Sequence, residues 1–183
     1  MITRPRGLVI ILLAVEDMNI TIARVTENDF NLCRALRLRA LSDSPEAFGG
    51  TLKNALERSL DEYKEDAIRW ATSEKSTLFL GTFETVPIGM IGAYIEENEK
   101  RSYLCGLWVE PEYRNKGVAS RLCSQAISWL VKRSSNFIYL WVANQNQVAV
   151  SLYKKLGFKA TNETQRLPSN ENIIETLYVY NHG

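Results

Sequence analysis

The stretch from Leu104 to Phe158 constrains the fold of this chain more than any other part of it. It opens with a short apolar run, Leu104 to Val109, which predicts a strand. Pro111 ends that strand because proline has no backbone N–H to donate. From Lys116 onward apolar residues recur at near-helical spacing, which predicts a helix directly after the strand. The unpaired N–H groups of the first helical turn would then lie at the end of the strand.

Gly117 lies where this predicted helix begins, and Arg114 and Lys116 add positive charge beside it. The first turn of a helix also carries the positive end of the helix dipole, and a glycine has no side chain to keep an anion away. We therefore predict a diphosphate site, with an ordinary helix start and a solvated basic cluster as the alternative. The segment is not a P-loop, which needs Gly-Lys-Ser/Thr, and it lacks the three spaced glycines of a dinucleotide fingerprint.

Two motifs in this stretch together resemble those of the GNAT superfamily of N-acetyltransferases. Arg114-Asn-Lys-Gly-Val-Ala119 is similar to the Arg/Gln-x-x-Gly-x-Gly/Ala motif of that superfamily. The segment from Asn146 to Phe158 is similar to a later motif, and it stands at a similar distance downstream. Each motif alone is suggestive, whereas both in order, separated by one helix and one strand, are highly specific. The resemblance extends over residues 20–180.

The resemblance implies an α/β (α+β) GNAT fold. Its central sheet would be mixed, with about seven strands, splayed parallel strands at its centre and helices on both faces. The element order read from the sequence is βααβββαβαββ. The expected helices before the first motif are residues 29–41 and 60–72. The expected strands outside the stretch are residues 20–24, 77–83, 88–95, 158–166 and 172–180.

Composition argues against several other classes of protein. Lys and Arg number 22 and Asp and Glu number 21, so no strong field points to nucleic acid or to a charged membrane surface. The chain has three cysteines, no Cys-x-x-Cys pair and one histidine, which disfavours a disulfide framework and a metal site. Reduced thiols fit a cytoplasmic protein.

A single N-acetyltransferase domain is expected over residues 18–183. Residues 1–17 would form an N-terminal extension, either an extra strand or a non-native start. The apolar run Leu8 to Val15 superficially resembles a signal peptide, but Glu16 and Asp17 follow it with no small-residue cleavage site. Homodimerisation is common in the superfamily, and this run is a candidate for such a contact.

By the same resemblance, acetyl-CoA would lie in a gap between strands 104–109 and 137–142. Its pantetheine arm would pair with the first strand, its pyrophosphate would bind the helix start, and Asn146 would contact the arm from the second strand's loop. The implied cofactor-binding residues are Leu107, Trp108, Val109, Arg114, Asn115, Lys116, Gly117, Val118, Ala119, Ser120 and Asn146. The Trp108 side chain could instead belong to the core.

The implied reaction is direct transfer of an acetyl group to a primary amine of a small molecule or peptide. Tyr153 would protonate the departing CoA thiolate, although a tyrosine packed on the core is the alternative. Many relatives carry a glutamate base where this chain has Cys105 or Trp141, and neither side chain is a good base. The base is therefore left unassigned. A non-catalytic CoA-binding regulatory module is the alternative function.

The resemblance identifies fewer residues for the acceptor site than for the cofactor site. The loop after the first predicted helix often borders the acceptor in the superfamily. Glu46 and Phe48 of this loop are therefore candidate substrate-binding residues, with an exposed loop acid as the alternative for Glu46.

Overall fold

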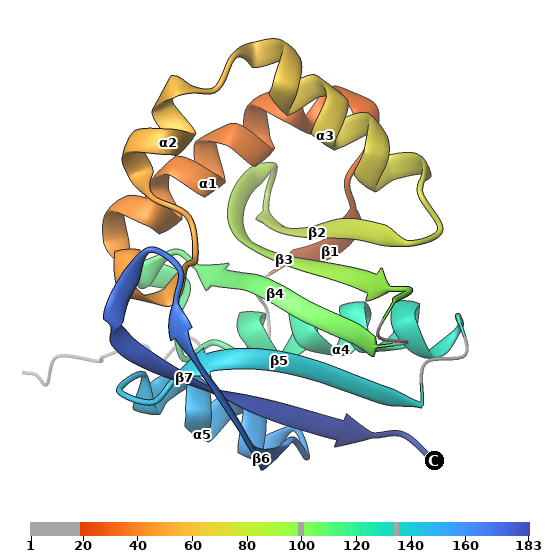
Figure 1. The fold of residues 1–183 in the computed structure, drawn as a ribbon. Coiled ribbons are helices and arrows are strands. Elements are labelled where there is room, and N and C mark those ends of the chain that lie inside the picture. Colours follow the sequence, from red (N-terminus) through yellow and green to blue (C-terminus); the bar gives the residue numbers. More distant parts are fainter. Residues whose placement is uncertain (1–18, 99–100, 134–135) are drawn as a thin grey trace, which may run out of the picture.

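A seven-stranded mixed sheet in the order β1-β2-β3-β4-β5-β7-β6 forms the centre of the protein (Figure 1). The computed structural model describes residues 19–98, 101–133 and 136–183. Only β4 and β5 pair in parallel, and every other neighbouring pair is antiparallel. The strands are β1 (Ile20–Arg24), β2 (Ser76–Phe83), β3 (Val86–Glu96), β4 (Arg101–Val109), β5 (Phe137–Ala143), β6 (Lys159–Leu167) and β7 (Asn170–Asn181).

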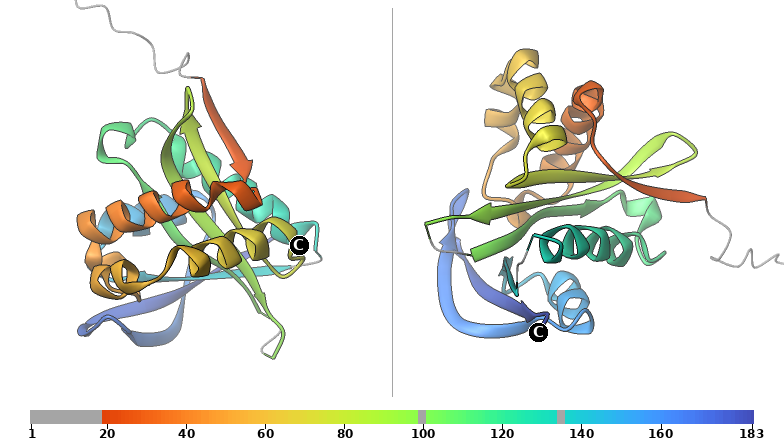
Figure 2. Two further views of the ribbon diagram at one scale, coloured as in Figure 1. Left: turned by 90° about the horizontal axis from the view of Figure 1, so that it is seen from above. Right: turned by 90° about the vertical axis from the view of Figure 1, so that its right-hand side faces the viewer.

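Helices cover both faces of this sheet, as Figures 1 and 2 show. One layer holds α1 (Phe30–Asp43), α2 (Leu52–Glu57) and α3 (Leu60–Thr72), and the other holds α4 (Val118–Val131) and α5 (Gln147–Lys155). Each layer encloses its own apolar core, with Leu36 and Ala40 of α1 in one and Leu122 and Leu130 of α4 in the other. The expected GNAT fold, a mixed sheet between two helical layers, is confirmed.

The helix predicted over residues 60–72 is α3, and a short helix that the predicted element order lacked, α2, precedes it. The added helix, α2, is short, and its N-cap residue Thr51 accepts a hydrogen bond from Asn54 N at 3.2 Å. It ends before Ser59, whose side chain caps α3 together with Glu62. A helix this short has too few turns to give a clear apolar period, and for that reason the sequence pattern did not reveal it.

The central parallel strands separate soon after they meet. The β4–β5 pairing consists of Ser102 with Ile138 and Tyr103 with Tyr139, and beyond these pairs the strands have no common register. From Leu104 onward β4 is paired on its β3 side alone. The expectation of splayed parallel strands is therefore confirmed.

A bulge lies in β4 just beyond this separation. On β3, Gly92 pairs with Cys105 and Met90 pairs with Trp108. Only one β3 residue lies between Met90 and Gly92, and on β4 both Gly106 and Leu107 face it. Gly106 has a φ of +62°, the left-handed conformation that glycine adopts without a steric penalty. The register thus leaves Leu107 without a partner on β3, and β5 has already diverged.

The predicted extension at residues 1–17 lies outside the described residues. Among the helices in the described part of the chain, none combines the length and the apolar character needed to cross a membrane.

Candidate active site

The loop between β4 and α4 has the backbone conformation of an anion site. The sequence predicted a helix from Lys116 onward, but α4 begins at Val118, because Gly117 is its N-cap residue and has a φ of +77°. Asn115 also has a positive φ, of 59°. A Cβ atom built on Gly117 would meet no atom within 4 Å, so the backbone of the first turn is open to a ligand. These features fit the predicted diphosphate site.

The two basic residues of this loop are placed differently. Arg114 turns back toward the sheet, where Nε donates to the Val109 carbonyl at 2.9 Å and Nη2 donates to the Asp43 carboxylate. Lys116 lies over the ring of Tyr113, with Nζ 5.4 Å from the ring centroid. Lys116 thus stays beside Gly117, whereas Arg114 ties the loop to the end of α1.

Asp43 joins α1 to both β4 and this loop. Its carboxylate accepts hydrogen bonds from Ser44 Oγ at 2.7 Å and Trp108 Nε1 at 2.9 Å, as well as from Arg114. Burial alone would raise the pKa of Asp43, but the hydrogen bonds from these three donors outweigh it and lower the pKa below its usual value.

The residues of β4 and α4 that are predicted to contact the cofactor differ in whether their side chains are buried. The Trp108 indole is buried in the core beneath α1, so it is the backbone of this residue that remains for a cofactor. Val109 and Val118 are likewise core residues, whereas Leu107, Ala119 and Ser120 are partly exposed. Contact with a cofactor in this region therefore falls mainly to the main chain.

Tyr153 and Asn146 come from α5 and its cap. Asn146 is the N-cap residue, with Oδ1 accepting from Ala149 N at 3.1 Å, so the amide nitrogen of Asn146 is the group left for a ligand. Tyr153 is 8% exposed and packs edge-on against Phe158 with ring centroids 5.8 Å apart. Burial raises the pKa of Tyr153 far above its usual value, and the nearby Cys123 and Cys105 thiols add to the effect.

Gly157 ends α5 in a left-handed cap. Its φ is +94°, its N–H donates to the Lys154 carbonyl and the N–H of Phe158 donates to the Tyr153 carbonyl, each at 3.0 Å. This pair of hydrogen bonds is a Schellman motif, and it fixes the turn of α5 that carries Tyr153.

A cavity of ≈ 550 Å³ lies on the α1–α3 side of the separating strands. Its walls come from α1, α3, the loop after α1, strands β2 to β5 and the β6–β7 hairpin. Ser169 Oγ in that hairpin donates to the Phe48 carbonyl at 2.6 Å and so joins two of these walls. The aromatic lining residues are Phe48, Tyr63, Trp70, Tyr94, Tyr103 and Trp141. A cavity with several aromatic side chains and a few polar ones in its walls has the character of a site for an organic ligand.

Cys105 and Trp141 both line this cavity, one from each of the separating strands. The Cys105 thiol is exposed to the cavity yet surrounded by protein, and this burial raises its pKa to about 11 although the positive charge of Arg37 opposes the rise. Neither residue supplies a carboxylate, as the sequence indicated.

Two acidic residues reach the cavity from other elements. Asp66 on α3 is occupied by Arg58 at 2.8 Å and Arg69 at 2.5 Å. Glu175 on β7 is only 6% exposed, and one of its oxygens accepts from Gln165 Nε2 at 2.9 Å.

Arg37 on α1 also lines the cavity, and its guanidinium lies over the Phe48 ring at 4.8 Å. Burial lowers the pKa of Arg37. Sequence reasoning did not single out Arg37 or Glu175. A charged residue within the largely apolar run from Ile173 to Val179 was the available signal for Glu175.

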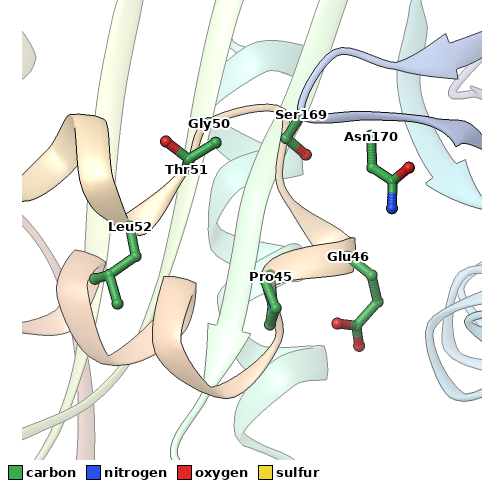
Figure 3. Close-up of a pocket in the computed structure, with 7 residues that line it drawn as sticks. All are labelled: Pro45, Glu46, Gly50, Thr51, Leu52, Ser169 and Asn170. Carbon is green, nitrogen blue, oxygen red and sulfur yellow. The ribbon is translucent and has the colours of Figure 1, made fainter.

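The two candidate acceptor-site residues, Glu46 and Phe48, line two neighbouring pockets. Phe48 is buried and lines the large cavity. Glu46 is exposed and lines a smaller pocket of ≈ 320 Å³ instead, together with Thr51 and residues of the β6–β7 turn (Figure 3). Gly50 borders both spaces.

Residues 41–158 match the Acetyltransferase (GNAT) family. The chain belongs to this family. The matched segment contains β4, the loop at Gly117, α4, β5 and α5, and it therefore includes both motifs that carried the resemblance.

Individual relatives of this GNAT chain are distant. An uncharacterised N-acetyltransferase of Methanocaldococcus jannaschii is 27% identical over 115 residues, which cover 56% of this chain and 51% of that protein. The chain spans about half the length, or less, of the first curated relatives that it matches.

Solved GNAT structures share the fold over most of their length. A GNAT acetyltransferase of Streptococcus pneumoniae superimposes with a TM-score of 0.75 at 19% identity, covering 89% of this chain and 99% of that one. RimL, a ribosomal L7/L12 α-N-protein acetyltransferase determined in complex with coenzyme A, superimposes with a TM-score of 0.69 at 13% identity, covering 92% and 97%.

Proposed function

We propose that this chain is an acetyl-CoA-dependent N-acetyltransferase that acts on a primary amine of a small molecule or peptide. The proposal depends on one observation, which is that β4 and β5 separate from each other. The gap between them lies between two spaces. The open backbone at Gly117 lies on the α4 side, and the aromatic cavity lies on the α1–α3 side. A cofactor lying through this gap would bring its acetyl group to the cavity.

The residues present fit acetyl-CoA. Its diphosphate would bind the main-chain N–H groups around Gly117, where a Cβ atom would find open space. Lys116 adds a cation at the rim. The pantetheine amides would pair with the β4 backbone at Leu107 to Val109, on the side where β5 has left the strand. When bound, acetyl-CoA supplies an activated thioester.

Two groups of the chain support the chemistry. The N–H of Leu107, at the bulge, would donate to the thioester carbonyl oxygen as negative charge develops on it. Tyr153 would hold a proton for the departing thiolate. Its raised pKa keeps this phenol protonated at neutral pH, as a general acid requires.

The test is thiol release from acetyl-CoA with a panel of amines, comparing the wild-type chain with Tyr153→Phe. We expect kcat to fall on the order of 100-fold or more, because a positioned general acid contributes this much, while affinity for coenzyme A stays within about twofold. Tyr180→Phe is the matched control. Tyr180 packs on Phe158 from β7 and does not line the cavity, so turnover should persist.

Binding of coenzyme A without turnover of any amine would favour the non-catalytic regulatory module instead. Equal kcat values for Tyr153→Phe and the wild type would remove Tyr153 from the mechanism and leave the transferase assignment intact.

A further inference from the structure

Arg37 presents a guanidinium that is held in place inside the acceptor cavity. The Phe48 ring lies on one side of it, 4.8 Å from Cζ. Gly50 lies on another side, where a Cβ atom would come within 3.0 Å of Nη2. The missing side chain at Gly50 therefore leaves room for the guanidinium, and the aromatic face positions it.

No protein acceptor takes up the donors of Arg37. Arg58 and Arg69 pair with Asp66, and Arg114 pairs with Asp43. By contrast, Arg37 forms no hydrogen bond and no ion pair with a carboxylate or carbonyl among the described residues, and its contact is with the Phe48 ring. A guanidinium carries several N–H donors in a rigid planar fork that matches a carboxylate. A positioned and unpaired fork in a ligand cavity is a ready carboxylate site.

Glu175 supplies the opposite charge from another wall of the same cavity. It is 6% exposed, and its carboxylate accepts a hydrogen bond from the neutral amide of Gln165 at 2.9 Å. No Lys, Arg or His within the described ranges pairs with it. A buried carboxylate is costly unless it is paired, so a cation at this position would be favoured.

Arg37 also lies near the place where the strands separate. It lines the same cavity as Cys105, the residue just before the β4 bulge. A carboxylate bound to Arg37 would therefore lie in the cavity that the proposed transfer site adjoins.

We propose that the acceptor is an amino-acid-like molecule, whose carboxylate binds Arg37 and whose ammonium group is drawn toward Glu175. The proposal rests on the proposed N-acetyltransferase function and names its substrate class. The aromatic lining favours an acceptor with an apolar or aromatic side chain.

The test uses probes that differ only in the carboxylate. Acetyl transfer to phenylalanine is compared with transfer to phenylalaninamide and phenethylamine, in the wild type and in Arg37→Gln. We expect kcat/KM to favour phenylalanine on the order of 10- to 100-fold, because a charge-assisted contact is lost in the other two. Arg37→Gln should abolish this preference, and Arg37→Lys should restore part of it.

Arg39→Gln is the matched control, because Arg39 lies on the same helix, is exposed and pairs with Glu110 outside the cavity. The preference should survive this change. A structural effect of Arg37→Gln would lower transfer to all three amines together and leave their ratio unchanged.

A binding measurement separates this inference from the proposed function. With coenzyme A present, N-acetylphenylalanine should bind more tightly than N-acetylphenethylamine, and Arg37→Gln should remove the difference. This result without any acetyl transfer would refute the transferase and leave the carboxylate site standing. Equal use of all three amines, or a preference that persists in Arg37→Gln, would refute the carboxylate site and leave the transferase standing.

Discussion

Tyr153 and Cys105 are kept protonated by the same feature, burial beside the diverging strands. The pKa of Tyr153 is raised well above 10, and that of Cys105 is raised to about 11. For Tyr153 this environment preserves the proton that a general acid donates. For Cys105 it suppresses the thiolate, so this residue is a poor general base at neutral pH.

Cys105 should react with iodoacetamide slowly, although it is exposed to the cavity. At pH 8 its thiolate fraction is about 100-fold below that of a thiol of pKa 9.0, and only the thiolate reacts. The rate should rise about tenfold per pH unit above pH 8, as measured by mass spectrometry of the folded protein.

Buried Cys33 and Cys123 should remain unlabelled in the same experiment, and Cys105→Ser should remove the signal. A rate at pH 8 equal to that of a free thiol would contradict the raised pKa.

At the scale of elements, Asp43 connects the end of α1 with β4 and the loop before α4. Its carboxylate accepts from Trp108 and Arg114, so the helix over the large cavity and the loop proposed for the cofactor share one anchor. Arg114 therefore holds this junction together in the structure.

Asp43→Asn should lower the free energy of unfolding by about 1 kcal/mol at pH 7, because charge-assisted hydrogen bonds become neutral ones. The folded-state pKa of Asp43 is lowered. Its contribution is therefore present above the unfolded value of 3.8 and is lost as the pH falls through the lower folded value. Denaturant unfolding at pH 7 and at pH 3 should show the difference shrinking.

Asp61→Asn is the control, since Asp61 is exposed and pairs only with Lys64 on the same helix. It should change stability by less than about 0.5 kcal/mol. A deficit for Asp43→Asn that is the same at both pH values would rule out the ionic contribution.

In the molecule as a whole, the separation of β4 from β5 links the stability of the folded state to ligand binding. These strands have only two paired positions, so a ligand in the gap would add contacts between the two parts of the sheet. A ligand that binds only the folded state stabilises it, by about 2.7 kcal/mol at a concentration 100 times its Kd.

Coenzyme A should therefore raise the Tm of the wild-type chain, by several degrees at such a concentration. Gly117→Asp should abolish the increase, because it sets a negative charge in the proposed diphosphate site. Gly117→Asn has the same shape without the charge and tolerates the left-handed conformation better than most residues, so it should keep part of the increase. An undiminished increase in Gly117→Asp would argue against a diphosphate at this loop.

Features that depend on near neighbours were predictable from the sequence. They include the strand end at Pro111, the left-handed Gly157, the glycine at the start of α4 and the order of most elements. Such features follow from backbone sterics and local hydrogen bonding, which act over a few residues. The two motifs added the family and its splayed strands, which the match over residues 41–158 and the sheet register confirm.

Only the tertiary structure decided which side chains share the large cavity. Arg37 on α1 and Glu175 on β7 stand far apart in the sequence, and they line one space because α1, α3 and the β6–β7 hairpin all border the same part of the sheet. Packing likewise buried the Trp108 indole and turned Arg114 toward Asp43. Local preference constrains a residue's own backbone, whereas its partners across the fold depend on how whole elements fill space together.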